Sequence, residues 1–226
     1  MALFDTRTGQ LSCSEPARCQ RGYLPGATFE LVTSAVALEN GVLDDAESAV
    51  PSDGKGHDNP DWNHGHTLRS ALQVSCLPCF QGLARTVGEA PLRAWLTRAS
   101  YGNQQGGGPV ETLGLSGELS ISPLQQVDFL RRLDGGQLPL QPRTLDVLRE
   151  VLTLDVGSDY ILRGKIAFSA PPEQTADIGW FIGDVELGEQ RAFFATVVDG
   201  HSGDVDLKVV QRRVTERVLR ELRLLP

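Results

Sequence analysis

Long apolar runs are missing from this sequence. No stretch reaches the roughly 18–20 apolar residues that a bilayer-spanning helix needs, and the mean hydropathy is −0.17. Residues 1–13 also lack the basic start and apolar stretch of an export signal. We therefore expect a cytoplasmic protein that does not cross a membrane, unless an export segment has been removed.

Basic residues are in the minority. The 226 residues include 21 Lys and Arg against 29 Asp and Glu, giving a net charge of −8 and a pI of about 5.0. Domains that bind nucleic acid usually carry an excess of basic residues. The composition therefore predicts a protein without a nucleic-acid partner.

Cysteines are few, and their spacing is incomplete for a zinc site. Cys76 and Cys79 have the two-residue separation of redox and zinc motifs, but Cys13 and Cys19 are too far apart to form a second such pair. We expect four thiols, with Cys76 and Cys79 reduced and packed in the interior. A Cys13–Cys19 disulfide is the alternative if the protein is exported.

Metal and phosphate motifs are also incomplete. His57, His64 and His66 lie close to Asp58 and Asp61, a combination that can bind a metal ion. They occupy a polar, glycine-containing segment, so we interpret them as loop residues. The glycine-rich residues 102–109 lack the Lys-Ser/Thr of a phosphate-binding loop. We expect neither a metal ion nor a cofactor.

The spacing of apolar residues changes along the chain from helical to strand-like. An N-terminal hairpin is expected at residues 1–13. Helices are predicted for residues 28–39, 67–99 with a break near Gly88, 123–133, 142–153 and about 205–224. Strands are predicted for residues 160–168, 178–185 and 192–198. The last helix would bury a stripe formed by Val210, Val214, Val218 and Leu222.

This order predicts one α+β domain over residues 1–226. Its antiparallel sheet would be flanked by helices and completed by both chain ends. A helical subregion would occupy about residues 51–153, and the sheet and terminal helix residues 160–226.

Several short motifs resemble those of class D serine β-lactamases, a family of the penicillin-recognising superfamily. Residues 23–30 read Tyr-Leu-Pro-Gly-Ala-Thr-Phe-Glu, similar to the family's Tyr-x-Pro-Ala-Ser-Thr-Phe-Lys. Residues 75–78, 101–103 and 165–167 fall where the family has Ser-x-Val-Pro, Tyr-Gly-Asn and Lys-Thr/Ser-Gly. The resemblance implies a β-lactamase/transpeptidase-like fold, N-terminally shorter than usual. It also implies the periplasmic or secreted location common in the family.

The resemblance also implies a changed reaction centre. In the family, a serine at a helix N-terminus attacks the lactam carbonyl, and a carbamylated lysine one turn later is its base. A tryptophan supports the carbamate. The resemblance places Ala27 at the serine, Glu30 at the lysine and Gly114 at the tryptophan. Alanine has no nucleophile and glutamate cannot carry a carbamate, so we expect no acylation by β-lactams.

Other parts of the family's pocket are retained. Ser75 keeps the hydroxyl that shuttles a proton, and Lys165 keeps the cation that attracts the substrate carboxylate. Glu30, Ser75 and Lys165 form the degenerate catalytic group. The implied pocket is lined by Ala27, Glu30, Ser75, Leu77, Tyr101, Asn103, Gly114, Lys165, Ile166, Ala167 and Phe168. The family's carboxylate-binding arginine has no single counterpart, because Lys208, Gln211 and Arg212 align equally well.

Three functions follow from these residues. The first is a catalytically degenerate protein that binds a small molecule in the former cleft or a protein partner, including a second copy. The alternative is an enzyme of different chemistry with Glu30 as general acid or base, and the minor alternative is an ordinary β-lactamase. Glu30 should face Lys165 across the cleft. We expect an ion pair, because a buried carboxylate is costly to leave unpaired.

Overall fold

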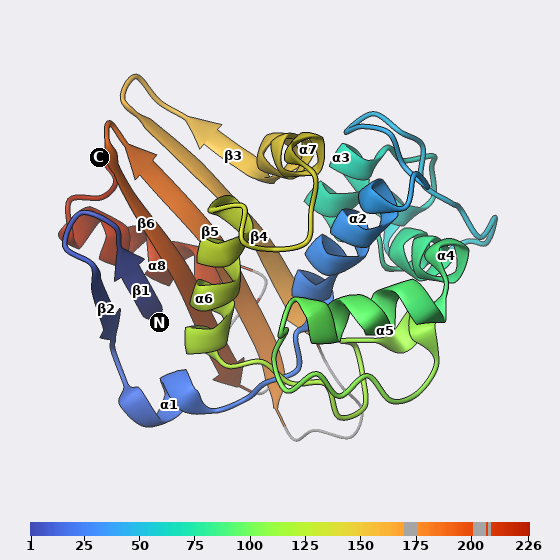
Figure 1. Ribbon diagram of the computed structural model, residues 1–226, viewed down its shortest axis with the longest axis horizontal. Helices are drawn as coiled ribbons and strands as arrows, with labels where there is room; N and C mark the ends of the chain where they lie inside the picture. The colour runs from blue at the N-terminus through green and yellow to red at the C-terminus, as the bar shows by residue number, and fades with distance from the viewer. Residues whose placement is uncertain (170–175, 201–206, 208) are drawn as a thin grey trace.

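The computed structural model describes residues 1–169, 176–200, 207 and 209–226. A twisted antiparallel sheet of six strands runs through this part of the chain, with helices on both faces (Figure 1). From one edge to the other, its strands are β2 (Gln10–Cys13), β1 (Ala2–Asp5), β6 (Gln190–Gly200), β5 (Asp177–Leu187), β4 (Tyr160–Ser169) and β3 (Thr153–Val156).

The two faces of the sheet bury separate cores. Successive side chains of a strand point to opposite faces, so Phe193 packs on the side of the large helical block and Phe194 on the other side. Helix α8 (Val210–Glu221) covers the Phe194 side, where Leu219 is fully buried. This arrangement confirms the predicted α+β fold, an antiparallel sheet flanked by helices.

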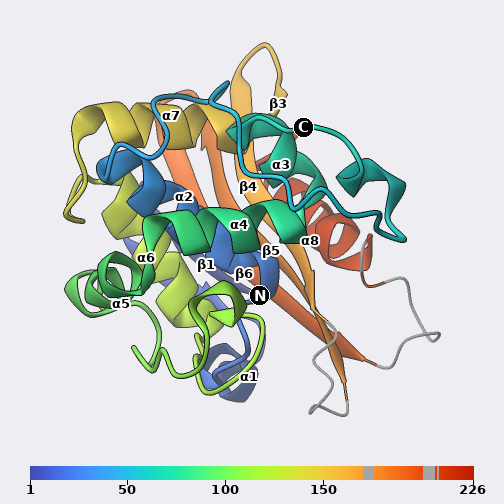
Figure 2. The same cartoon turned by 90° about the vertical axis from the view of Figure 1, so that its right-hand side faces the viewer.

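The helical block contains α2 (Phe29–Glu39) at its centre, as Figure 2 shows. Every residue of α2 from Phe29 to Leu38 is buried, because other elements pack around it. Its neighbours in the block are α3 (Leu68–Val74), α4 (Leu77–Val87), α5 (Glu89–Arg98) and α7 (Pro142–Leu152), and α6 (Pro123–Asp134) packs against the sheet. A short α1 (Pro16–Gln20) connects the hairpin to this block.

Most predicted elements are present, and three differ. The expected 67–99 region contains three helices, because Ser75 adopts a left-handed backbone conformation (φ 46°) that ends α3 before α4 begins. Helix α1 and strand β3 were not predicted. Both are only a few residues long, so they carry little periodicity.

The predicted apolar stripe of the last helix is wrong. Val214 and Leu222 are 42% and 53% exposed, whereas Gln211, Thr215 and Leu219 face the sheet. The facing strands decide this rotation. Thr215 donates a hydrogen bond to the hydroxyl of Thr196 (2.6 Å). Of the expected span, residues 205, 206 and 208 lie outside the described residues.

None of the described helices is long and apolar enough to cross a bilayer.

Candidate functional site

The start of α2 is fixed against β4 by a tight turn. Gly26 has a positive φ (56°), and a Cβ there would lie 2.9 Å from Cβ of Ser169. The Gly26 amide donates to the carbonyl of Gly114 (2.8 Å). The turn places Ala27, 7% exposed, just before α2, and Glu30 in its first turn.

Glu30 and Lys165 form the expected ion pair. Lys165 Nζ of β4 lies 2.9 Å from Glu30 Oε2, and the two side chains are 3% and 5% exposed. The same ammonium donates to the carbonyl of Leu72 (2.6 Å) and to Ser75 Oγ (2.5 Å). These two oxygens accept hydrogen bonds from the ammonium, whereas its contact with Glu30 is an ion pair without hydrogen-bond geometry.

Burial sets the protonation of Glu30. Loss of hydration raises the pKa of Glu30 from its ordinary 4.5 to about 7, and the attraction of Lys165 opposes a larger rise. Neither carboxylate oxygen of Glu30 has a hydrogen-bond partner among the described residues. The carboxyl group is therefore ionised in part near neutral pH.

Tyr101 and Asn103 match the family's Tyr-Gly-Asn motif, but their side chains contact the core and a neighbouring loop. The Tyr101 ring packs edge-on against Phe29 and Phe129. Burial raises the pKa of its hydroxyl, which stays neutral. Asn103 Nδ2 donates to the carbonyl of Glu118 (2.7 Å), and Asn103 Oδ1 accepts from the Ser120 amide (3.1 Å). These contacts hold the core and a loop together, and among the described residues neither side chain contacts Lys165.

Gly114 lies against α2 without room for a side chain. Its φ is +79°, and a Cβ there would be 2.6 Å from Phe29 Cβ. A larger residue at this position would have to displace Phe29 from the first turn of α2.

The residues after Lys165 alternate between the two cores. Ala167 is buried on the same side as Lys165, in the core of the helical block. Ile166 packs toward the α8 side, as strand geometry requires for its neighbour. Phe168 is half-buried and, by the same alternation, points away from Lys165.

A small cavity adjoins the ion pair. Its lining includes Glu30, Thr33, Leu77, Phe80, Gln81 and Glu111. The centre of a water molecule can occupy about 20 Å³ of it, which is room for one or two waters. Glu30 and Leu77 are the predicted pocket residues that line it.

The structure does not identify a counterpart of the family's carboxylate-binding arginine among the described residues near the start of α8. Gln211 is fully buried and its amide atoms have no hydrogen-bond partner among the described residues. It fills the space beside Gly179. Arg212 pairs with Glu216 through Nε and Oε1 (2.6 Å), and Lys208 lies outside the described residues.

The expectation of four thiols is wrong. Cys13 is joined to Cys19, and Cys76 to Cys79. Their Cα atoms are 6.4 and 5.3 Å apart, within the range that a disulfide spans. The Cys13–Cys19 bridge is the alternative that the sequence left open, whereas the Cys76–Cys79 bridge was not expected.

Known proteins share this fold and about a third of the aligned residues. Residues 3–220 match the penicillin-binding protein transpeptidase domain family. The β-lactamase OXA-48 of Klebsiella pneumoniae is 32% identical over 209 residues, which are 92% of this chain and 77% of that protein.

Two further relatives widen the comparison. The regulatory protein BlaR1 of Bacillus licheniformis is 30% identical over 88% of this chain and 33% of its own length. A crystal structure of a class D β-lactamase from Nostoc is 34% identical, with a TM-score of 0.93 over 99% of this chain and 93% of that one. The chain therefore belongs to the class D β-lactamase family.

Proposed function

We propose that this protein is a catalytically degenerate member of its family, which does not acylate β-lactams and acts by binding. The observation that carries the proposal is the buried contact between Glu30 and Lys165. In the family that the sequence resembles, a lysine at this position attracts the substrate carboxylate. Here Glu30 already supplies that negative charge, so a carboxylate ligand would have to displace it.

The hydroxyl and methyl groups near the pair support the same proposal. Ala27 offers only a methyl group at the expected position of the nucleophile. Ser75 is the hydroxyl in contact with Lys165, but it accepts a hydrogen bond from the ammonium. A protonated amine cannot remove the serine's proton, so Ser75 has no base in Lys165.

The size of the cavity argues for a restricted ligand. Pockets for drug-sized molecules usually enclose about 300–1,000 Å³, far more than one or two waters occupy. A β-lactam would enter only if the side chains around Glu30 and Leu77 moved. A relative named as a regulatory protein shows that this domain also occurs outside proteins named as β-lactamases, which favours a binding role.

A second candidate function rests on the pKa of Glu30. A carboxyl group whose pKa is about 7 can both give and take a proton near neutral pH, as general acids and bases do. Glu111 also lines the cavity and would provide a second carboxyl group there. This enzyme would use the cleft for chemistry other than lactam opening.

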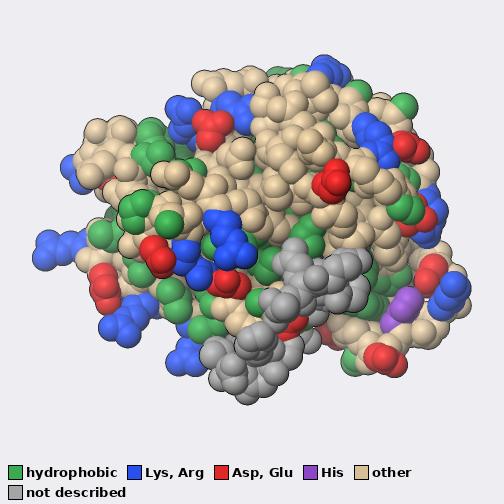
Figure 3. Space-filling view, turned by 90° about the horizontal axis from the view of Figure 1, so that it is seen from below, with side chains coloured by type: hydrophobic (Ala, Val, Ile, Leu, Met, Phe, Trp, Pro, Cys, Tyr) green, Lys and Arg blue, Asp and Glu red, His purple; other side chains and the backbone are tan. Residues whose placement is uncertain are grey.

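A protein partner is the other class of ligand in the proposal. Strand β2 forms one edge of the sheet, and edge strands offer unpaired backbone groups to another chain. Its Leu11 is 52% exposed, which suits pairing with a second copy. On the face seen in Figure 3, basic side chains lie among acidic ones instead of gathering in a basic patch, which favours a partner other than nucleic acid.

The location of the protein is also a proposal. Disulfides persist in oxidising compartments and are rare in the cytoplasm. The two bridges of this chain therefore favour an exported protein over the cytoplasmic one expected from the sequence.

Turnover of a chromogenic cephalosporin tests the proposal. Nitrocefin should show no saturable hydrolysis by this protein under conditions where OXA-48 hydrolyses it. Saturable turnover that disappears in Ser75→Ala would reject the binding role and support the alternative that the protein is a β-lactamase.

A further inference from the structure

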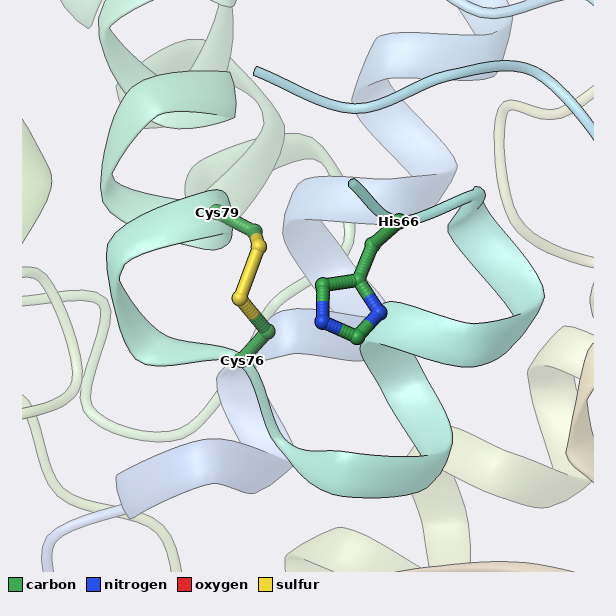
Figure 4. A group of neighbouring side chains, drawn as sticks. All are labelled: His66, Cys76 and Cys79. Carbon is green, nitrogen blue, oxygen red and sulfur yellow. A yellow bond between two sulfur atoms is a disulfide. The ribbon is translucent and has the colours of Figure 1, made fainter. Parts of the chain in front are cut away.

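A second group of reactive side chains lies at the start of α4. His66, Cys76 and Cys79 place one imidazole nitrogen and two sulfur atoms within 4.8 Å of one another. All three residues are buried, at 5%, 0% and 4% exposure. Figure 4 shows a ring nitrogen of His66 turned toward the disulfide between the two cysteines.

We propose that the reduced cysteines Cys76 and Cys79 bind a thiophilic divalent metal ion such as zinc, together with His66. The disulfide is the oxidised, closed form of the same site. This inference is independent of the proposed function, because none of the three side chains forms a hydrogen bond or an ion pair with Glu30 or Lys165 in the described part of the chain.

Opening the site requires a two-electron reduction. A dithiol reductant breaks the Cys76–Cys79 bond, the two sulfurs become thiols, and the reductant becomes a disulfide. Zinc binding then releases both thiol protons. Two thiolates balance the charge of the ion, and the neutral histidine adds none, so the buried site carries no net charge.

The backbone suits this ligand set. Two sulfurs on tetrahedral zinc lie about 3.8 Å apart, given Zn–S bonds of about 2.3 Å. The two Cα atoms are 5.3 Å apart, and the Cys-x-x-Cys spacing is the usual one for zinc. Both cysteines lie in the first turn of α4 (Leu77–Val87) or at its N-cap, where the helix dipole favours thiolates.

His66 already has the outer contact that a metal-bound histidine needs. Its Nδ1 lies 3.0 Å from Ser70 Oγ, and its Nε2 lies 2.8 Å from the carbonyl oxygen of Asp61. Metal-bound histidines usually donate their other N–H to a protein acceptor. The Asp61 carbonyl can only accept, so Nε2 carries the proton in this structure. Metal binding would move the proton to Nδ1, where Ser70 is the acceptor, and Nε2 would present its lone pair to the metal. The Asp61 carbonyl, on an exposed residue, can turn to water.

The site has a fourth ligand position and lies near the surface. Three protein ligands leave one position of a tetrahedral site for water. The ring centroid of the exposed His64 lies 4.2 Å from that of His66, with the two rings tilted by 40°, so His66 lies one side chain below the surface.

Metal titration of defined redox forms tests the proposal. The matched control is the double variant Cys13→Ser/Cys19→Ser, which keeps Cys76 and Cys79 as its only cysteines. After reduction, this variant should bind one zinc per chain in competition with a chromogenic chelator. Cobalt should give thiolate-to-metal charge-transfer absorption. After reoxidation, both signals should disappear, because the sulfurs are joined again.

Two further variants identify the ligands. Cys76→Ser/Cys79→Ser should lose stoichiometric binding, and His66→Gln should weaken it by at least about tenfold, the lower limit even for outer contacts. Circular dichroism checks that each variant folds. The reduced and oxidised forms of the control variant decide the matter even if the others do not fold. Failure of the reduced control to bind zinc, or equal binding after reoxidation, would show that the disulfide is only a structural bridge.

Discussion

Lys165 holds Glu30 in the interior at 2.9 Å, across the junction between β4 and α2. The ammonium also donates to Ser75 and to the carbonyl of Leu72, so it joins α2, α3 and the sheet. Charged groups this deeply buried are costly to leave without partners. The pair is therefore part of the fold, and in the proposed function it is also the feature that closes the cleft to a carboxylate substrate.

The stability of the protein should fall as the pH rises from about 4.5 to about 7. Burial raises the pKa of Glu30 from 4.5 to about 7, so in this window the folded state binds more protons than the unfolded state. The stabilising contribution is complete below pH 4.5 and is lost as the pH passes 7. One pKa unit corresponds to about 1.4 kcal/mol, so the full change is a few kcal/mol.

Urea unfolding at a series of pH values measures this slope. The Glu30→Gln variant has no carboxyl group to ionise at this position. Its fall in stability between pH 4.5 and 7 should therefore be smaller than that of the wild type by a few kcal/mol. An identical pH profile for both proteins would show that Glu30 does not titrate in this range.

Lys165→Met should destabilise the protein at pH 8 by about 3 kcal/mol. It leaves the Glu30 carboxylate without a cation in a poorly hydrated interior. Adding Glu30→Leu to that variant should recover most of the loss, because replacing both members of a buried pair with apolar residues is often neutral or stabilising. Chemical unfolding of the two variants measures which of them is more stable. A double variant less stable than Lys165→Met would contradict it.

Ala27→Ser alone should not restore β-lactam turnover. The new hydroxyl would lie one helical turn from Glu30, whose charge is held by Lys165, and Gly114 has no space for a supporting side chain beside Phe29. Adding Glu30→Lys should return slow acylation without efficient turnover. Steady-state nitrocefin kinetics separate the cases, and efficient hydrolysis by the single variant would show that a competent base is already present.

The Cys13–Cys19 disulfide should contribute about 2 kcal/mol to stability, as expected for a short closed loop. Cys13→Ser/Cys19→Ser should unfold at correspondingly lower urea concentration. Thiol titration of the unreduced wild-type protein in denaturant should detect no free thiols. Four thiols per chain in protein purified without reductant would instead support the reduced form expected from the sequence.

Much of the fold and the central contact could be predicted from the sequence. The largely apolar pattern of α2 and the strand-like period around Lys165 were strong enough to place both elements. Glu30 on the pocket side of a largely apolar helix indicated a buried carboxylate that needs a cation. Local patterns of this kind survive folding because they are set by burial itself.

Other features depend on tertiary contacts between distant segments, and local sequence patterns do not predict these contacts. Tyr101 matches the tyrosine of the family's Tyr-Gly-Asn motif, but its ring packs between Phe29 and Phe129. Helix α8 turns its threonine inward because Thr196 faces it. His66 reaches the cysteine pair only because the chain turns back before α3, so a search for a second cysteine pair could not find it.

Intact-mass spectrometry after incubation with benzylpenicillin tests the central claim most directly. The proposal predicts an unchanged protein mass at every incubation time, while OXA-48 treated in parallel serves as the acylated control. A stable increase by the mass of one penicillin, located by peptide mapping at Ser75 or at any other residue of the cleft, would contradict it.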